Sequence, residues 1–263
     1  MRITVHAPFG ALSQEAGVIF MLANYLRSLF PAVVQLKCNG VFSYCDRGGE
    51  ENRQRGFDTC FRCMQDQLSL ARWAGISSEP LSQRLLPGEI EATRRLVLHT
   101  PTEKLPELVF EELPLLELCR ASFQSRFGVS QPDFHNKNHE QVLRRMMLAA
   151  ARMCVAVKRF NREFMPDISL VAGGWDLISR SLVDVCRRDG YQAAVFRWDF
   201  EGGGINIVHP RTHQVLVSDL LLDGIASMRP DISTWPSELV NITGEILAFL
   251  DISDTQMTLP IAR

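Results

Sequence analysis

The chain has 263 residues, of which 46% are hydrophobic, and it carries a formal net charge of −2. This composition is sufficient to bury a sizeable core, and the near-balance of charge gives no indication of a nucleic-acid partner or an anionic membrane surface. No apolar run reaches the roughly 18–20 residues of a membrane-spanning helix, so we expect no transmembrane segment.

The N-terminal sequence favours a cytoplasmic location. Residues 1–6 lead directly into a strand pattern, without an apolar signal core or a small-residue cleavage site. We therefore expect a protein that is not secreted. Thiols in the cytoplasm stay reduced, which favours metal binding or catalysis over disulfide formation for cysteines that cluster.

The first part of the chain has the pattern of an α/β unit. Residues 3–5 and 33–36 are predicted strands, and residues 18–30 between them are a predicted helix. This order is typical of a βαβ unit with parallel strands. A polar loop is expected over 46–58, and a second helix over 59–73.

The middle of the chain is predicted to be helical. Residues 88–127 have mostly helical periodicity, interrupted by Pro101, Pro106 and Pro114. A long helix is expected over 137–164, ending before Pro166, because its apolar residues repeat at helical spacing.

After Pro166 the α/β pattern returns. Strands are expected over 168–172 and 193–197, with a helix over 176–188 between them. A hairpin over 205–218 and a last helix within 237–250 complete the predicted elements.

These elements predict an α/β fold with Rossmann-like parallel sheet units at both ends and a helical middle segment. The predicted boundaries are 1–85 for the N-terminal unit, 86–165 for the helical segment and 166–263 for the C-terminal unit. The helical segment is either an insertion between two halves of one α/β domain or a bridge between two small domains.

Four of the seven cysteines lie close together in the sequence. Their spacing is Cys38-x6-Cys45-x14-Cys60-x2-Cys63, whereas the other three are scattered through helical patterns. Four thiolates suit one tetrahedral metal site, so we predict zinc, with an iron–sulfur cluster as the alternative. The other interpretations are a redox dithiol at Cys60 and Cys63, and thiols that are simply buried.

The cysteine segment resembles that of a family of bacterial surface-carbohydrate proteins. The family's pattern is seen in Cys38-Asn39-Gly40, Cys45-Asp46 and Cys60-Phe61-Arg62-Cys63. The Gly173-Gly174-Trp175-Asp176 turn lies where the family has a strand, an Asn-Gly-Arg-like turn and a helix, but its sequence departs from Asn-Gly-Arg. These proteins look like glycosyltransferases of the two-Rossmann-domain type, labelled capsule or polysaccharide biosynthesis proteins. The resemblance implies a nucleotide-sugar or other phosphorylated small molecule as ligand.

Three predicted strand ends supply candidate ligand-binding residues. A Gly-Gly turn before a helix offers N–H groups to an anion, although a tight turn capped by an acidic residue has the same pattern. An arginine after the next strand can pair with a diphosphate and a nearby aspartate can act as a base, or the two can form a surface ion pair. Because ligands collect at the carboxyl ends of parallel strands, we predict one site from these residues: His6, Gly173, Gly174, Asp176, Arg197 and Asp199.

The leading hypothesis is a glycosyltransferase-like protein of bacterial surface-polysaccharide metabolism, with or without catalysis. No catalytic residue is assigned. One alternative is a non-enzymatic, metal-stabilised scaffold or assembly protein, and another is an iron–sulfur or thiol redox protein.

Overall fold

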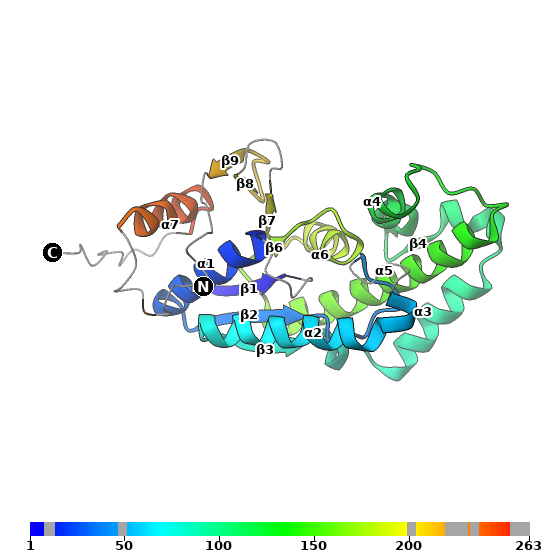
Figure 1. The fold of residues 1–263 in the computed structure, drawn as a ribbon, viewed down its shortest axis with the longest axis horizontal. Coiled ribbons are helices and arrows are strands. Elements are labelled where there is room, and N and C mark those ends of the chain that lie inside the picture. Colours follow the sequence, from blue (N-terminus) through cyan, green and yellow to red (C-terminus); the bar gives the residue numbers. More distant parts are fainter. Residues whose placement is uncertain (8–13, 47–51, 199–203, 219–230, 232–236, 253–263) are drawn as a thin grey trace.

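A computed structural model describes residues 1–7, 14–46, 52–198, 204–218, 231 and 237–252 of the chain. Its central element is a seven-stranded sheet with the order β3-β2-β1-β6-β7-β8-β9 (Figure 1). Its strands are β1 (Arg2–His6), β2 (Ala32–Lys37), β3 (Ser77–Pro80), β6 (Ile168–Ala172), β7 (Ala193–Trp198), β8 (Ile205–Val208) and β9 (Val215–Ser218). The five neighbouring strands β3, β2, β1, β6 and β7 are parallel. Strands β8 and β9 add an antiparallel hairpin next to β7. The predicted Rossmann-like α/β fold is confirmed.

Helices cover both faces of the sheet. Helices α1 (Gln14–Leu29) and α2 (Asn52–Ala74) lie on one face, and α5 (Lys137–Phe164) and α6 (Leu177–Arg188) lie on the other. Successive strand residues point to opposite faces, so each strand contributes to two cores. In β6, for example, Leu170 packs with α1 and Val171 packs with α5 and α6.

The middle segment is built on α5. It contains α3 (Pro87–His99), α4 (Leu115–Phe127), the 3-10 helices η2 (Leu81–Arg84) and η3 (Thr102–Glu107), and a short hairpin of β4 (Val109–Phe110) and β5 (Leu113–Pro114). Figure 1 shows these elements at one end of an elongated molecule, away from both termini. The segment leaves the sheet after β3 and returns at β6, so one sheet contains strands from both ends of the chain.

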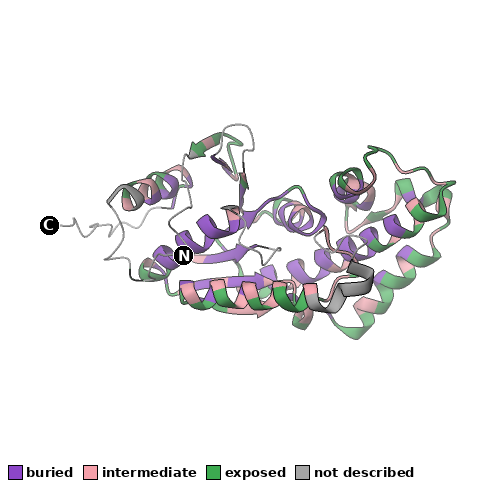
Figure 2. Ribbon diagram, in the orientation of Figure 1, coloured by how far each residue is buried: buried purple, intermediate pink, exposed green. Residues whose placement is uncertain are grey.

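Burial follows this layered arrangement. The inner surfaces of α1, α5 and α6 are buried, whereas α3 and the outer side of α4 are largely exposed (Figure 2). Helix α7 (Ser237–Phe249) packs through Ile246 and Leu247 on the same side as α1. No helix in the described ranges combines the length and the apolar character needed to cross a membrane.

The start of α2 and the presence of β3 differ from the sequence prediction. Helix α2 begins at Asn52, seven residues before the predicted start at Thr59, and residues 47–51 of the predicted loop lie outside the described residues. Strand β3 was not expected, because Ser-Ser-Glu-Pro has no apolar alternation. It forms at the sheet edge, where Ser78 Oγ donates a hydrogen bond to Gln35 Oε1 at 2.5 Å.

Candidate functional site at the carboxyl edge of the sheet

The sheet places three of the predicted strand ends beside one another. Strand β1 pairs in parallel with β6, and β6 with β7, so His6, Gly173 and Arg197 lie at one edge. The chain runs outward from β1 to β2 and β3 on one side, and from β6 to β7 on the other. The junction of β1 and β6 is therefore the topological switch point, which is where open α/β sheets bind ligands.

His6 lies beneath this edge. Its side chain has no exposed surface, and its Nδ1 is 3.2 Å from the Leu36 carbonyl oxygen. Burial lowers the pKa of His6 from 6.5 to about 4, so the imidazole is neutral at physiological pH. Its Nε2 atom has no hydrogen-bond partner among the described residues.

The Gly173–Gly174 turn links β6 to α6. Both glycines have positive φ angles, 82° and 73°, and a Cβ at Gly174 would lie 2.5 Å from Val195 Cγ1. The Gly173 N–H donates to the Phe196 carbonyl at 2.8 Å, and the Gly174 N–H donates to Ser179 Oγ at 2.8 Å. Since both amides have acceptors within the protein, an anion at this edge would rely on side-chain donors.

Asp176 caps helix α6. Its Oδ1 accepts hydrogen bonds from the N–H groups of Ile178 at 3.1 Å and Ser179 at 3.0 Å. The side chain has no exposed surface, and burial, followed by the nearby charge of Asp46, raises its pKa from 3.8 to about 7. Helix capping is therefore the observed role of Asp176, and its predicted role in ligand binding stays a prediction.

Asp46 is a second carboxyl group at the same helix end, and the sequence analysis did not identify it. Its Oδ2 accepts a hydrogen bond from the Leu177 N–H at 3.2 Å, and the same N–H donates to Ser122 Oγ at 2.8 Å. Burial raises the pKa of Asp46, while its hydrogen bond with Ser122 and the Leu177 N–H act in the opposite direction. Asp46 and Leu177 are 131 residues apart in the sequence, so no local sequence pattern predicts this hydrogen bond.

Arg197 is the basic side chain at this edge. Its Nε donates to the Gly173 carbonyl oxygen at 3.2 Å, which joins the ends of β6 and β7. Burial, and then the charges of Arg180 and Arg187, lower its pKa. Within the described part of the chain, no carboxylate forms an ion pair with Arg197, and Asp199 lies outside that part.

Three of the four clustered cysteines are neighbours in space. Cys38 follows β2, and Cys60 and Cys63 lie on α2. Burial raises the pKa of Cys38 to about 11, with further increases from the nearby thiols of Cys63 and Cys60. Cys45 lies further along the same segment, beside Tyr44, whose pKa it helps to raise.

Backbone and side-chain amides surround two of these thiols. The N–H groups of Gly40 and Val41 form hydrogen bonds with the Cys38 sulfur, and the Gln67 side-chain amide donates to Cys63 Sγ at 3.2 Å. Donors of this kind stabilise a thiolate, and similar contacts orient metal ligands. However, no three His, Cys, Asp or Glu side chains of the described ranges form a group that could hold a metal ion, so zinc stays a prediction.

The remaining cysteines belong to the core. Cys119, Cys154 and Cys186 have no exposed surface and pack between α4, α5 and α6. A free cysteine behaves as a small hydrophobic residue, so burial in a core is its ordinary position.

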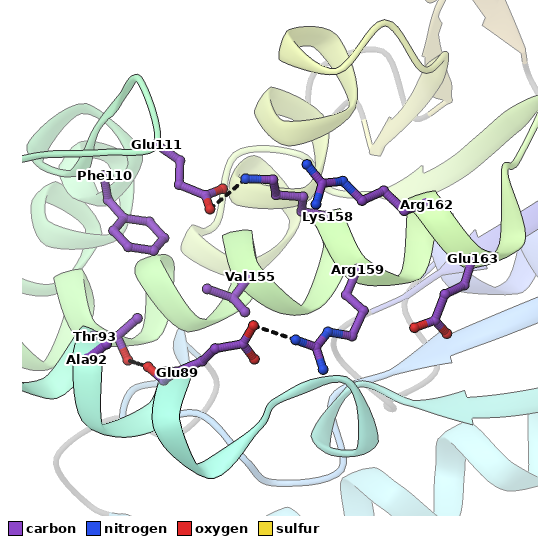
Figure 3. Close-up of a pocket in the computed structure, with 10 residues that line it drawn as sticks. All are labelled: Glu89, Ala92, Thr93, Phe110, Glu111, Val155, Lys158, Arg159, Arg162 and Glu163. Carbon is purple, nitrogen blue, oxygen red and sulfur yellow. Dashed lines mark hydrogen bonds and ion pairs between the residues drawn. The ribbon is translucent and has the colours of Figure 1, made fainter.

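A separate cavity lies on the helical segment, far from the switch point. It has a volume of about 320 Å³ and lies between α3, the β4–β5 hairpin and α5 (Figure 3). Two ion pairs cross it, one between Lys158 and Glu111 at 2.7 Å and one between Arg159 and Glu89. These charged side chains pair with one another. We therefore infer that the two ion pairs hold α3 and the β4–β5 hairpin on α5.

Comparisons with protein-family models, with curated proteins and with solved structures found no match.

Proposed function

We propose that the protein is glycosyltransferase-like and binds a nucleotide-sugar, or a related phosphorylated small molecule, at the carboxyl edge of its sheet. The observation that carries this proposal is the position of Arg197, an exposed arginine near the end of β7, next to the β1–β6 switch point, with no carboxylate in ion-pair contact among the described residues. A cation beside two other arginines is stabilised by an anion, and phosphate accepts paired hydrogen bonds from a guanidinium.

Trp175 supports the same assignment. Its side chain is 45% exposed although it follows the buried turn at Gly173 and Gly174. Trp175 follows Gly173 by two residues, and the Gly173 carbonyl accepts a hydrogen bond from Arg197. An exposed indole near this point offers a flat surface on which a base or a sugar ring can stack. We also propose that the protein acts in bacterial surface-polysaccharide metabolism in the cytoplasm, because its cysteine pattern resembles that of proteins with this role.

Isothermal titration calorimetry with uridine diphosphate glucose tests the proposal. Arg197→Ala should weaken binding by about 1.5–3 kcal/mol, the contribution of a hydrogen bond to a charged group. The control is Arg95→Ala, because Arg95 is exposed on α3, where it forms an ion pair with Glu91. Equal affinity of the wild type and Arg197→Ala would remove Arg197 from the site, and no binding of uridine diphosphate sugars by the wild type would contradict the proposed function.

The second candidate function is a metal-stabilised scaffold. The observation that favours it is the neighbourhood of Cys38, Cys60 and Cys63: the thiols of Cys63 and Cys60 help to raise the pKa of Cys38, and the thiol of Cys63 helps to raise the pKa of Cys60. A structural zinc would fix the segment after β2 to the start of α2 and requires no substrate. Metal content without nucleotide-sugar binding would favour this function.

A further inference from the structure

A second cleft opens beside the start of α6. Its volume is about 530 Å³, which is within the range of small-molecule sites. Its walls come from the segment after β2, from α4 and from the start of α5. The side chains that define it are Tyr44, Asp46, Ser122, Arg126, Phe127 and Asn138.

The charges of the described residues that line this cleft balance. Among these residues, Asp46 is the one carboxyl group and Arg126 is the one cation. Asp46 is held by Ser122 and by the Leu177 N–H, and Arg126 forms a side-chain hydrogen bond with Tyr44. Among the described lining residues no second cation is present, so the cleft lacks the excess positive charge that a phosphate requires.

The remaining groups suit hydroxyl groups and an apolar ring face. Tyr44 and Asn138 each carry both donor and acceptor capacity, whereas the Ser122 hydroxyl is already bonded to the Leu177 N–H and to Asp46. The Asn138 side chain is exposed at the start of α5, where its backbone N–H, rather than its amide, contributes to the helix cap. Phe127 is half-buried and held by rings on α4 and α5, with centroid distances of 4.6 Å to Phe123 and 4.4 Å to His139.

We propose that this cleft binds an uncharged, hydroxyl-rich molecule, namely a sugar. The ligand's hydroxyls would meet Asp46, Tyr44 and Asn138, and its C–H face would lie on Phe127. Each hydroxyl group of a sugar can both donate and accept a hydrogen bond, and a sugar carries no charge. Both properties fit described lining residues whose charges sum to zero. The inference is independent of nucleotide-sugar binding, because the cleft lining does not include Arg197.

Saturation-transfer difference NMR of the full chain with uncharged sugars tests this inference. The probes are D-glucose, D-galactose, D-mannose and N-acetyl-D-glucosamine, each at about 20 mM, since a few hydrogen bonds give millimolar affinity. At least one sugar should show transfer. Asn138→Ala should weaken its binding about five-fold, as expected for the loss of one hydrogen bond or two.

The matched control is Gln124→Ala. Gln124 is an exposed amide side chain on α4 that does not line the cleft, so binding should be unchanged. Tyr44→Phe provides a second variant, and circular dichroism checks that each variant is folded. Arg197→Ala should bind the sugar as the wild type does, which separates this site from the proposed nucleotide-sugar site.

Three results would overturn the inference. These are no transfer to any of the four sugars, equal binding by the wild type and Asn138→Ala, and displacement of the sugar by inorganic phosphate. The last result would identify an anion site rather than a site for an uncharged ligand.

Discussion

The Asp46 carboxylate accepts a hydrogen bond from the backbone N–H of Leu177, the first residue of α6, at 3.2 Å. This contact joins the segment after β2 to a helix on the other side of the switch point. A carboxylate at a helix N-terminus is stabilised by the helix dipole and by the free N–H groups of the first turn. It also places two carboxyl groups, Asp46 and Asp176, at one helix end.

Replacing Asp46 should show how much this contact stabilises the fold. Asp46→Ala removes the acceptor of a part-buried N–H, so we expect a loss of about 1–3 kcal/mol in the free energy of unfolding. Asp46→Asn keeps an acceptor oxygen and removes the buried charge, so its stability should stay close to that of the wild type. Urea denaturation at pH 7 measures both, and an unchanged Asp46→Ala would show that Ser122 alone is sufficient for the Leu177 N–H.

Asp176 should make stability depend on pH. Its pKa is about 7 in the folded protein and 3.8 as the ordinary value, so the folded state holds the proton more tightly than the unfolded state. The resulting stabilisation is complete below about pH 4 and is lost as the pH rises through about 7, with an upper limit of about 4 kcal/mol.

The variant Asp176→Asn isolates this effect. Asparagine resembles the protonated acid and is a good helix N-cap, so it should keep the capping oxygen for Ile178 and Ser179. Relative to Asp176→Asn, the wild type should lose stability between about pH 4 and about pH 7 in urea denaturation. Parallel pH profiles for the two proteins would contradict the raised pKa.

The clustered cysteines predict that the purified protein contains zinc. Protein purified without oxygen should contain about one zinc ion per chain, as a site with four thiolate ligands requires. Cys60→Ser should lower this content, because it removes one of the four predicted ligands, whereas Cys119→Ala should not, because Cys119 is buried in the core. Inductively coupled plasma mass spectrometry measures the metal, and absorption in the visible range would indicate an iron–sulfur cluster in place of zinc. Wild-type protein without metal would exclude the site.

Gly174 should tolerate no side chain. Its φ of 73° disfavours other residues, and a Cβ there would lie 2.5 Å from Val195 Cγ1. We expect Gly174→Ala to cost about 2–4 kcal/mol of stability, from backbone strain and overpacking together. Gly190 is the matched control, since its φ is 80° but its Cβ would have nothing within 4 Å, so Gly190→Ala should cost only about 1 kcal/mol. Equal losses in thermal denaturation would mean that packing at Val195 is not the constraint.

Local signals explain which elements could be predicted from the sequence. Helix α5 has the predicted limits because Asn136 caps its first turn and Met165, before Pro166, ends it in a left-handed conformation. Strand β6 has the predicted limits because it is apolar and buried on both faces. Strand β3 lacks such a signal, since its residues become a strand only by pairing with β2.

The sequence by itself determined most of the strands and helices along the chain, including the three strands whose ends carry His6, Gly173 and Arg197. It did not determine that these three strands are neighbours, because strand pairing was decided by the tertiary structure. Periodicity, turn residues and caps act over a few residues, so they can be read along the chain. Only the tertiary structure decided that the Gly173 and Gly174 amides are already used, that His6 is buried, and that Asp46 meets Leu177. Hydrogen bonding and burial of this kind depend on segments that are far apart in the sequence, and folding brings such segments together through the summed packing of many side chains rather than through any local pattern.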